Sequence, residues 1–185
     1  VYGAIRINDE HREELIQRAI AITGLSNPNS RNQLLDWLNE NTDLHLEKLT
    51  KETVSESLQV ANGAAEEVLR IRKNLSKSSV SKYQAMKSAV CHDHRIRGVL
   101  QFYGANRTGR WAGRLVQVQN LPHDVPPAID VARHLAKTGN RHGLELLYGD
   151  VASTLSQLIR TAFIAPDDAM LCVSDFSAIE ARVLS

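Results

Sequence analysis

The chain of 185 residues has few aromatic residues, two cysteines and no long apolar run. Cys91 and Cys172 lie far apart and form no Cys-x-x-Cys pair, which excludes a disulfide framework and favours reduced thiols in a cytoplasmic protein. No apolar stretch approaches the ~20 residues that a membrane-spanning helix needs, and the first residues do not resemble a signal peptide. Apolar residues still make up 43% of the chain, so we expect a globular protein of one or two domains with no membrane partner.

A large excess of one charge sign is also missing from the chain as a whole, whose formal net charge is +1. The charge is nevertheless unevenly distributed, because residues 68–123 contain eleven Lys and Arg but a single acidic residue, Asp93. This stretch therefore carries +10, which leaves −9 for the remainder. Such polarisation favours a polyanionic partner for the middle of the chain, and the alternative is a set of solvated helix faces that bind nothing.

The spacing of apolar residues predicts a mainly helical fold. Helices are predicted over about 9–23, 30–39, 54–61, 64–90, 129–137 and 141–162. Ser30 and Gln33 open the second helix as a capping box. Ser79 interrupts the fourth, so we expect a long or kinked helical pair there. Residues 1–7 are predicted to form an extended lead-in.

Two short strands are predicted in the second half of the chain. The first covers Gly98 to Tyr103, and the second covers residues 114–119, where Val and Gln alternate. Glycines in the loop between them would let its backbone approach a ligand closely. Together these elements predict a mainly α fold with a small antiparallel β part, of the α+β class.

A carboxylate near the end of the sequence lies at a predicted strand-to-helix corner. The apolar segment 169–173 predicts a buried strand with Cys172 packed beneath it, and Ser177 with Glu180 predicts the start of a helix. Asp175 falls between the two elements. Such a corner holds a carboxylate rigidly and leaves it open on one side, as metal binding requires. A lone Asp at a strand end is more often an ordinary surface residue.

Three blocks of the sequence resemble blocks of family A DNA polymerases, in the same order. The string Asp175-Phe-Ser-Ala-Ile-Glu-Ala-Arg182 is similar to motif A of that family, usually written DYSQIELR. Upstream, Ile159-Arg-Thr-Ala-Phe-Ile-Ala-Pro-Asp-Asp168 resembles the run into that motif. Thr108-Gly-Arg110, followed by Gln119-Asn-Leu-Pro122, resembles the TGR and LQNIP elements. The sequence of residues 109–114, Gly-Arg-Trp-Ala-Gly-Arg, is most similar to the phage and prophage branch of that family.

The resemblance implies template-directed nucleotidyl transfer by a two-metal mechanism. It assigns Asp175 as a catalytic carboxylate and, together with the carbonyl of Phe176, as a ligand of Mg²⁺, of which the complete enzyme holds two ions. Glu180 would be the sugar gate of the nucleotide site, which excludes a ribose 2′-hydroxyl. The implied partners are a DNA primer-template duplex and, in the parent enzyme, deoxynucleoside triphosphates. The implied location is the cytoplasm of a bacterial or phage-infected host cell.

The same resemblance implies that the middle of the chain binds the duplex. Arg110 is expected to reach the minor groove at the primer terminus, where every correct base pair presents similar acceptors. The other residues expected to contact DNA are Thr108, Arg107, Arg114, Gln119, Asn120, Lys77 and Lys82. Lys and Arg side chains that reach phosphates bind without reading the base sequence.

The implied domain organisation has three parts. Residues 1–50 are a helical lead-in, 51–97 a thumb-like helical arm, and 98–185 a partial palm with a helical insertion at about 123–160, ending inside motif A. The sequence contains no His-Asp-Glu block that would supply a second carboxylate. We therefore expect a polymerase fragment that binds Mg²⁺ weakly, extends no primer by itself and self-associates through apolar surface near 169–185. The alternatives are a non-catalytic nucleic-acid-binding module and a helical interaction protein that binds no nucleic acid.

Overall fold

The computed structural model describes residues 1–77, 80–172, 174 and 177–184, without the side chains of Ile179 and Glu180. The described elements, in chain order, are α1 (Tyr2–Thr23), α2 (Arg31–Asn41), α3 (Lys51–Ser57), α4 (Gly63–Leu75), α5 (Ser81–Ala89), β1 (Leu100–Ala105), β2 (Arg110–Gly113), the 3-10 helix η1 (Val118–Asn120), α6 (Ile129–Thr138), α7 (Arg141–Tyr148), α8 (Val151–Gln157), the 3-10 helix η2 (Ile159–Ala162) and α9 (Ile179–Leu184). The described chain is mainly helical with a two-stranded antiparallel sheet, which confirms the predicted α+β class.

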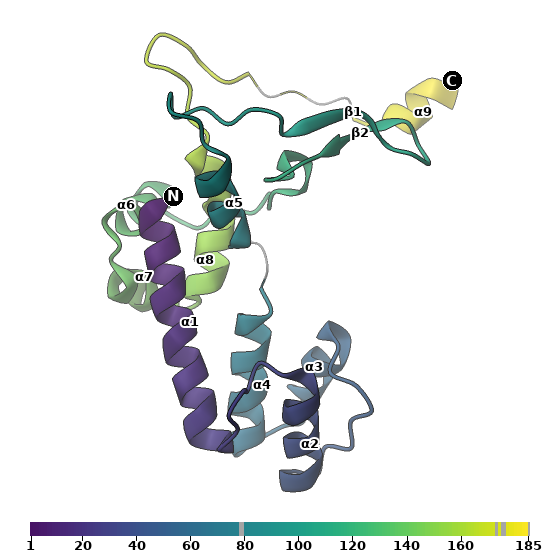
Figure 1. The fold of residues 1–185 in the computed structure, drawn as a ribbon, viewed down its shortest axis with the longest axis vertical. Helices are drawn as coiled ribbons and strands as arrows, with labels where there is room; N and C mark the ends of the chain where they lie inside the picture. The colour runs from purple at the N-terminus through teal and green to yellow at the C-terminus, as the bar shows by residue number, and fades with distance from the viewer. Residues whose placement is uncertain (78–79, 173, 175–176, 185) are drawn as a thin grey trace.

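Helix α1 runs along two groups of helices and joins them (Figure 1). Ile5 and Ile7, in its first half, belong to a core shared with α5, α6, α7 and α8. Ala19, in its second half, packs with Ile71 and Leu75 of α4, and α4 shares a further core with α2 and α3. We call α2, α3, α4 and the second half of α1 the arm, and α5 to α8 with the first half of α1 the base.

The arm is built on an antiparallel pair of helices, α1 and α4. Arg12 Nη1 of α1 donates to the carbonyl of Leu75 at 2.9 Å, whereas Arg18, further along α1, pairs with Glu67 near the start of α4. The predicted helical pair over 64–90 is confirmed as two helices, α4 and α5, but their buried residues belong to different cores. The antiparallel partner of α4 is therefore α1.

The start of the chain is helical from Tyr2, so the predicted extended lead-in over 1–7 is wrong. The reason is tertiary packing, because Ala4, Ile5 and Ile7 are buried against the base. Gly3 permits this packing, since a Cβ there would lie 2.8 Å from the carbonyl oxygen of Lys137. The apolar residues within 1–7 are too few to show a helical period in the sequence.

Side-chain caps open four of the described helices, α2, α3, α7 and α8. The Ser30 side chain accepts from the backbone N–H of Gln33 and caps α2 as predicted, but the described residues lack the return bond from the Gln33 side chain that would complete the predicted capping box. Helix α3 starts at Lys51, about three residues earlier than expected, because Thr50 and Thr53 form a reciprocal capping box. Such caps satisfy backbone N–H groups that have no partner within the helix.

The sheet is a hairpin whose second strand begins earlier than predicted. Leu100 pairs with Gly113, Gln101 with Ala112 and Ala105 with Arg110, with an irregularity between Gln101 and Ala105. The strand expected over 114–119 is wrong, and that stretch is a turn followed by η1.

The alternation that suggested the second strand has another cause. Val116 is fully buried in the base core and Val118 packs against that core, while Gln117 and Gln119 are exposed. Leu115 and Gln117 adopt the left-handed conformation, with φ of 55° and 52°. Buried and exposed residues thus alternate because the loop is anchored in the core, without any strand pairing.

The segment before the last helix is exposed, so the predicted buried strand over 169–173 is wrong where the structure describes it. Met170 is 82% exposed and Leu171 is 61% exposed, and residues 169–172 pair with no strand that the structure describes. Cys172 is exposed rather than packed. Val183 and Leu184 of α9 are also exposed, so apolar surface is present where self-association was expected.

The predicted insertion over about 123–160 forms α6, α7, α8 and part of η2, which pack beside α1. Arg141 of α7 pairs with Glu14 of α1 at 2.8 Å, and Arg6 donates to the carbonyl of Thr138 at 2.9 Å. Asp150, the N-cap of α8, pairs with Lys77 just beyond α4. The Arg6 contact lies within the base, whereas the Arg141–Glu14 and Lys77–Asp150 pairs brace the arm against the base. Among the described residues, no helix combines the length and the apolar character needed to cross a bilayer.

Candidate nucleic-acid interface

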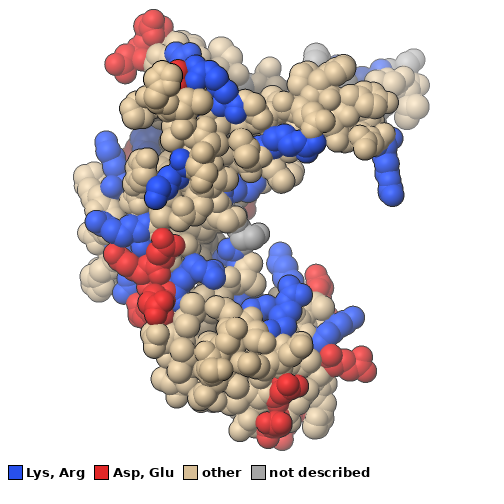
Figure 2. Space-filling view, viewed as in Figure 1, with Lys and Arg blue, Asp and Glu red and all other residues tan. Residues whose placement is uncertain are grey.

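A hollow separates the arm from the hairpin β1–β2 on one side of the molecule (Figure 2). Lys and Arg side chains lie along both walls of this hollow, whereas the larger groups of acidic side chains lie on outer surfaces in the same view. The uneven charge along the sequence is therefore also uneven in space. A hollow with basic walls concentrates a positive potential and favours a polyanion.

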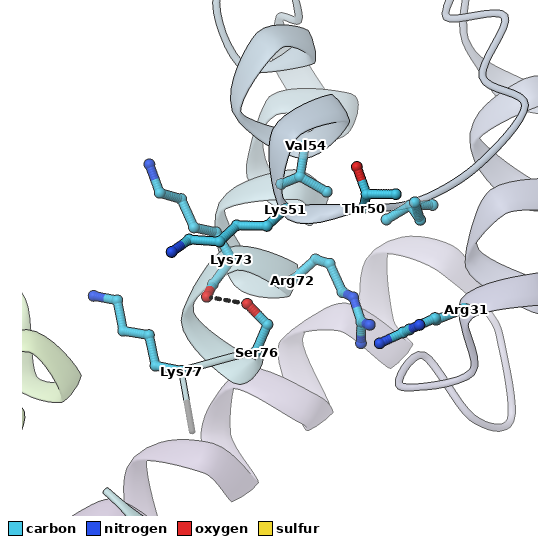
Figure 3. A pocket seen from close by; sticks show the side chains of 9 residues that line it. Arg31, Thr50, Lys51, Val54, Arg72, Lys73, Ser76 and Lys77 are labelled. Atoms are coloured by element: carbon cyan, nitrogen blue, oxygen red, sulfur yellow. Dashed lines mark hydrogen bonds between the residues drawn. The ribbon is translucent and has the colours of Figure 1, made fainter. Parts of the chain in front are cut away.

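The wall formed by the arm contains a cationic pocket of about 560 Å³. Its lining residues are Arg31, Leu49, Thr50, Lys51, Val54, Arg72, Lys73, Ser76 and Lys77. The ammonium groups of Lys51, Lys73 and Lys77 point to one side of the pocket (Figure 3). None of the described lining residues is acidic.

The cationic pocket is held in shape by helix ends. Arg31 begins α2 after the Ser30 cap, Lys51 begins α3 after the Thr50 cap, and Arg72 and Lys73 occupy the last turn of α4. Arg72 Nη1 donates to the carbonyl of Asn29 at 3.3 Å, which ties α4 to the start of α2.

Burial, and then the nearby charge of Arg31, lower the pKa of Arg72 from its ordinary value. Two guanidinium groups lie side by side here (Figure 3). An anion placed between them would relieve their mutual repulsion, so the arrangement favours a phosphate or carboxylate ligand.

Sequence reasoning missed half of this pocket. Arg31 and Lys51 lie outside the basic stretch 68–123 and are separated in sequence from Arg72 and Lys73. The cap signals before α2 and α3 were visible, but nothing in the sequence placed those two helix starts beside the end of α4.

Several basic residues of the stretch 68–123 are paired with acids rather than open to a ligand. Arg70 Nη2 lies 2.7 Å from Glu66, and Arg97 Nη2 lies 2.6 Å from Asp93. Asp93 is already counted in the charge of +10, so of these two pairs only Arg70–Glu66 offsets that charge. The solvated-face alternative applies to these exposed pairs. In the cationic pocket, by contrast, Arg31, Lys51, Arg72 and Lys73 form no ion pair with an acid of the described residues.

Lys77, predicted to bind DNA, lies at the cationic pocket but is ion-paired with Asp150. Burial by itself would raise the pKa of Asp150, but hydrogen bonds from Lys77 and from the backbone N–H of Ser153 outweigh it and lower that pKa. Lys82, also predicted to bind DNA, donates instead to backbone carbonyls of the loop before α6.

The tip of the hairpin carries Arg107, Thr108 and Arg110, and all three are exposed. The turn is closed by the backbone N–H of Thr108, which donates to the carbonyl of Ala105 at 3.0 Å. Arg114 pairs with Gln101 across the two strands. The structure thus groups four of the predicted DNA-binding residues on one hairpin.

The other face of the hairpin is aromatic. The rings of Phe102 and Trp111 meet edge to face, with centroids 5.2 Å apart. Phe102 is 71% exposed and Trp111 is 56% exposed, so this contact leaves most of both rings uncovered. The hairpin therefore has a polar face with Gln101 and Arg114 and an apolar face with the two rings.

The residues assigned to Mg²⁺ and to the nucleotide fall in the last part of the sequence, around α9. Asp175 and Phe176 lie outside the described residues, and the side chain of Glu180 does too. In α9, Arg182 Nε donates to the carbonyl of Ser177 at 3.0 Å. The described part of the chain gathers no group of three or more His, Cys, Asp or Glu that could hold a metal ion. The metal and sugar-gate roles therefore stay predictions.

Comparison with known proteins adds to this geometry. Residues 6–185 match the family model described as DNA polymerase family A. The chain is also 51% identical, over 186 residues, to a DNA polymerase of Bacillus phage SP02. That match covers 100% of this chain and 28% of the phage protein, so the chain spans less than a third of its relative. No solved structure matches the chain.

Proposed function

Because the chain belongs to DNA polymerase family A, we propose that it is part of a DNA-directed DNA polymerase and holds the primer-template duplex in its basic hollow. The observation that carries this proposal is the cationic pocket at the helix ends of the arm, together with the Lys and Arg side chains along both walls of the hollow. The relative is a phage protein, so the proposed place of action is the cytoplasm of an infected bacterial cell.

The arm supplies affinity in this proposal. Arg31, Lys51 and Lys73 offer cations from three different helices, which suits the closely spaced phosphates of a duplex backbone. Such contacts release counterions and ignore base sequence, as a polymerase that copies every template requires.

The hairpin and the loop after it supply position. Arg110 is proposed to reach the minor groove at the primer terminus, with Arg107 and Thr108 beside it at the hairpin tip. Gln119 and Asn120, exposed on η1, are proposed to contact the template-primer backbone. Minor-groove acceptors are similar for every correct pair, so an arginine there senses pair shape without reading sequence.

The chemical step belongs to the parent enzyme. Asp175 and the carbonyl of Phe176 are the proposed protein ligands of Mg²⁺, and Glu180 is the proposed sugar gate for the incoming deoxynucleoside triphosphate. Two such ions, when bound, would stabilise the attacking and leaving oxygens of phosphoryl transfer. In the parent enzyme, Asp175→Ala should abolish primer extension while duplex affinity stays near that of the unmodified protein. Near-normal turnover of this variant would exclude the metal role.

The chain by itself is proposed to bind duplex without extending a primer. It carries the motif A carboxylate but no His-Asp-Glu block, and one carboxylate holds two divalent cations poorly. The alternative, a non-catalytic nucleic-acid-binding module, makes the same binding prediction for the chain. Primer extension by the parent protein separates the two, because only a polymerase incorporates nucleotides.

A salt titration of duplex binding tests the role of the arm. The logarithm of the binding constant should fall linearly with the logarithm of the salt concentration, by ~0.9 for each phosphate neutralised. The double variant Lys51→Ala/Lys73→Ala should flatten that slope by about 1.8. Lys137→Ala, on α6 away from the cationic pocket, is the matched control and should leave the slope unchanged. An unaltered slope in the double variant would exclude the arm as a phosphate-binding surface.

A further inference from the structure

The loop that carries Gln119 and Asn120 is bent sharply and has no regular hydrogen-bonded neighbour among the described strands. Leu115 and Gln117 both adopt the left-handed conformation, which side chains other than glycine rarely take. Backbone in such a conformation persists only where its surroundings hold it. The loop therefore needs external support to present the same two side chains each time.

Lys82 of α5 gives one part of that support. Its Nζ lies 3.4 Å from the carbonyl oxygen of Val116, 3.5 Å from that of Gln117 and 3.0 Å from that of Asn120. The side chain is half-buried, and burial lowers the pKa of Lys82 from its ordinary value. An ammonium group that points into three carbonyls has its donors engaged within the protein.

Arg160 of η2 gives the other part. Its Nε donates to the carbonyl of Pro122 at 2.7 Å, and its Nη2 donates to the carbonyl of Leu121 at 3.1 Å. Two cations from different elements thus bind five carbonyls of one loop. The same loop is anchored in the base core by the buried side chains of Val116 and Leu121.

The start of the loop is also confined by the hairpin. A Cβ at Gly113 would lie 2.8 Å from the Cα of Gln117, closer than real Cβ atoms approach. The loop is thus held at three places, by the hairpin, by Lys82 and by Arg160. Gln119 and Asn120 remain exposed between these points.

We propose that Lys82 and Arg160 are positioning residues that hold the loop 115–122 by its carbonyls and thereby set Gln119 and Asn120 against the primer-template. Lys82 then binds no phosphate, because reaching one would release the three carbonyls that it holds. The proposal deepens the proposed function and rests on it for the identity of the ligand. The holding of the loop itself can be measured without DNA.

The first measurement uses the full-length polymerase without DNA. Lys82→Met removes the donors but keeps an unbranched side chain, and Lys82→Arg restores donors. Amide hydrogen exchange at Asn120, whose N–H donates to the Gln117 carbonyl at 3.0 Å, should be faster by about tenfold in Lys82→Met and near the unmodified rate in Lys82→Arg. Exchange at Asn120 that is unchanged in Lys82→Met would overturn the proposal, whatever the protein binds.

The second measurement uses primer-template and separates positioning from phosphate binding. Lys82→Met should leave the salt slope of duplex binding unchanged, whereas Lys73→Met, in the cationic pocket, should flatten it by about 0.9. Lys82→Met should also lower kcat/KM for single-nucleotide addition by about tenfold, within the ~10²-fold that a 1 Å misplacement can cost. A flattened slope in Lys82→Met would make Lys82 a phosphate ligand and overturn the proposal.

The last control is a double-mutant cycle. If Lys82 acts through the loop, its effect on kcat/KM should largely vanish once Gln119→Ala and Asn120→Ala are present. Multiplicative effects in the combined variant would overturn the positioning role. Arg160→Gln should repeat the pattern of Lys82→Met. A Lys73→Met variant with unaltered duplex binding would count against the proposed function alone, because the exchange measurement does not depend on DNA.

Discussion

The arm and the hairpin both carry basic residues toward the hollow, but they hold them in opposite ways. In the arm, the cations of the cationic pocket stand at helix ends fixed by caps and backed by the core of Leu34, Leu38 and Leu69. In the hairpin, Arg107 lies in the turn and Arg110 begins β2, and the large side chains of the two strands, Phe102 and Trp111, remain mostly exposed.

This difference teaches that the two regions are suited to different tasks. Holding like charges close together costs free energy, and the packed core of the arm offsets that cost. The cationic pocket is therefore suited to strong contacts with phosphate. A hairpin with little core of its own gains its final geometry from whatever it touches. Its residues are therefore better suited to sensing the shape of a ligand than to supplying affinity.

The largest expected effect tests the cores of the two regions. Leu69→Ala, at a side chain with 0% exposure, should lower the free energy of unfolding by about 2–5 kcal/mol. Phe102→Ala should cost less than ~1.5 kcal/mol, because that ring is mostly exposed and so are the two rings that it contacts, Tyr103 and Trp111. Urea unfolding of both variants measures the difference. Equal losses would show that the hairpin carries a core of its own.

The next effect tests the functional contrast in the full-length enzyme. Arg110→Ala should change the ratio of extension rates from matched and mismatched primer ends, by about tenfold, an effect worth ~1.4 kcal/mol. Lys73→Ala should lower duplex affinity for both ends equally, because phosphate contacts ignore the base pair. Primer-extension kinetics on paired templates give both ratios. A matched-to-mismatched ratio that moves with Lys73 and not with Arg110 would reverse the assignment.

A smaller effect is expected from the ion pair at the edge of the cationic pocket. Asp150→Asn keeps an N-cap for α8 but removes the charge beside Lys77. Stability at neutral pH should fall by about 0.5 kcal/mol, the typical value for a partly exposed pair. Because the folded pKa of Asp150 is lowered, the unmodified protein should lose this contribution as the pH falls through that pKa, and the variant should not.

The same substitution should tighten duplex binding at low salt. Lys77 would then face the cationic pocket without its acidic partner. The salt titration that tests the arm gives this readout as well. Weaker duplex binding by Asp150→Asn would show that the ion pair supports the pocket rather than competing with the ligand.

The smallest effect concerns His11 of α1, which lies near the charges of Arg141 and Glu145 of α7 and of Asp150 at the start of α8. Its Nδ1 is buried with no hydrogen-bond partner among the described residues. Burial, and then the charge of Arg141, lower the pKa of His11, although Glu145, Glu14 and Asp150 act in the opposite direction. The unfolded chain then binds more protons, so stability should fall by less than ~1 kcal/mol as the pH drops below ~6.5. His11→Gln should flatten this dependence in thermal unfolding.

Much of the helical fold could be predicted from local signals. The Ser30 cap and the break between the helices predicted over 54–61 and 64–90 both mark real helix ends. These signals work because a helix terminus must satisfy its own backbone groups within a few residues. The start of α1 escaped prediction because the base, and not the local sequence, makes Ala4, Ile5 and Ile7 helical.

The site was less predictable, because its parts meet only in three dimensions. The TGR block led to Arg107, Thr108 and Arg110, which the hairpin tip indeed exposes. Lys77 and Lys82 looked equivalent to them in sequence, yet one meets Asp150 and the other meets backbone carbonyls. The sequence around a lysine does not show whether an acidic side chain, a backbone carbonyl or a ligand lies nearest to its ammonium group.

Helix α1 has 22 residues and passes from the base into the arm without a break. At ~1.5 Å of rise and ~100° of turn per residue, it spans about 33 Å and sets both the distance and the rotation between the base and the arm. One residue inserted near its middle would rotate the arm by about 100° about the axis of α1. Seven inserted residues would return the arm to nearly the same orientation. Changes in the length of α1 should therefore be tolerated best in steps that restore its rotation to within ~20°, such as seven or eleven residues.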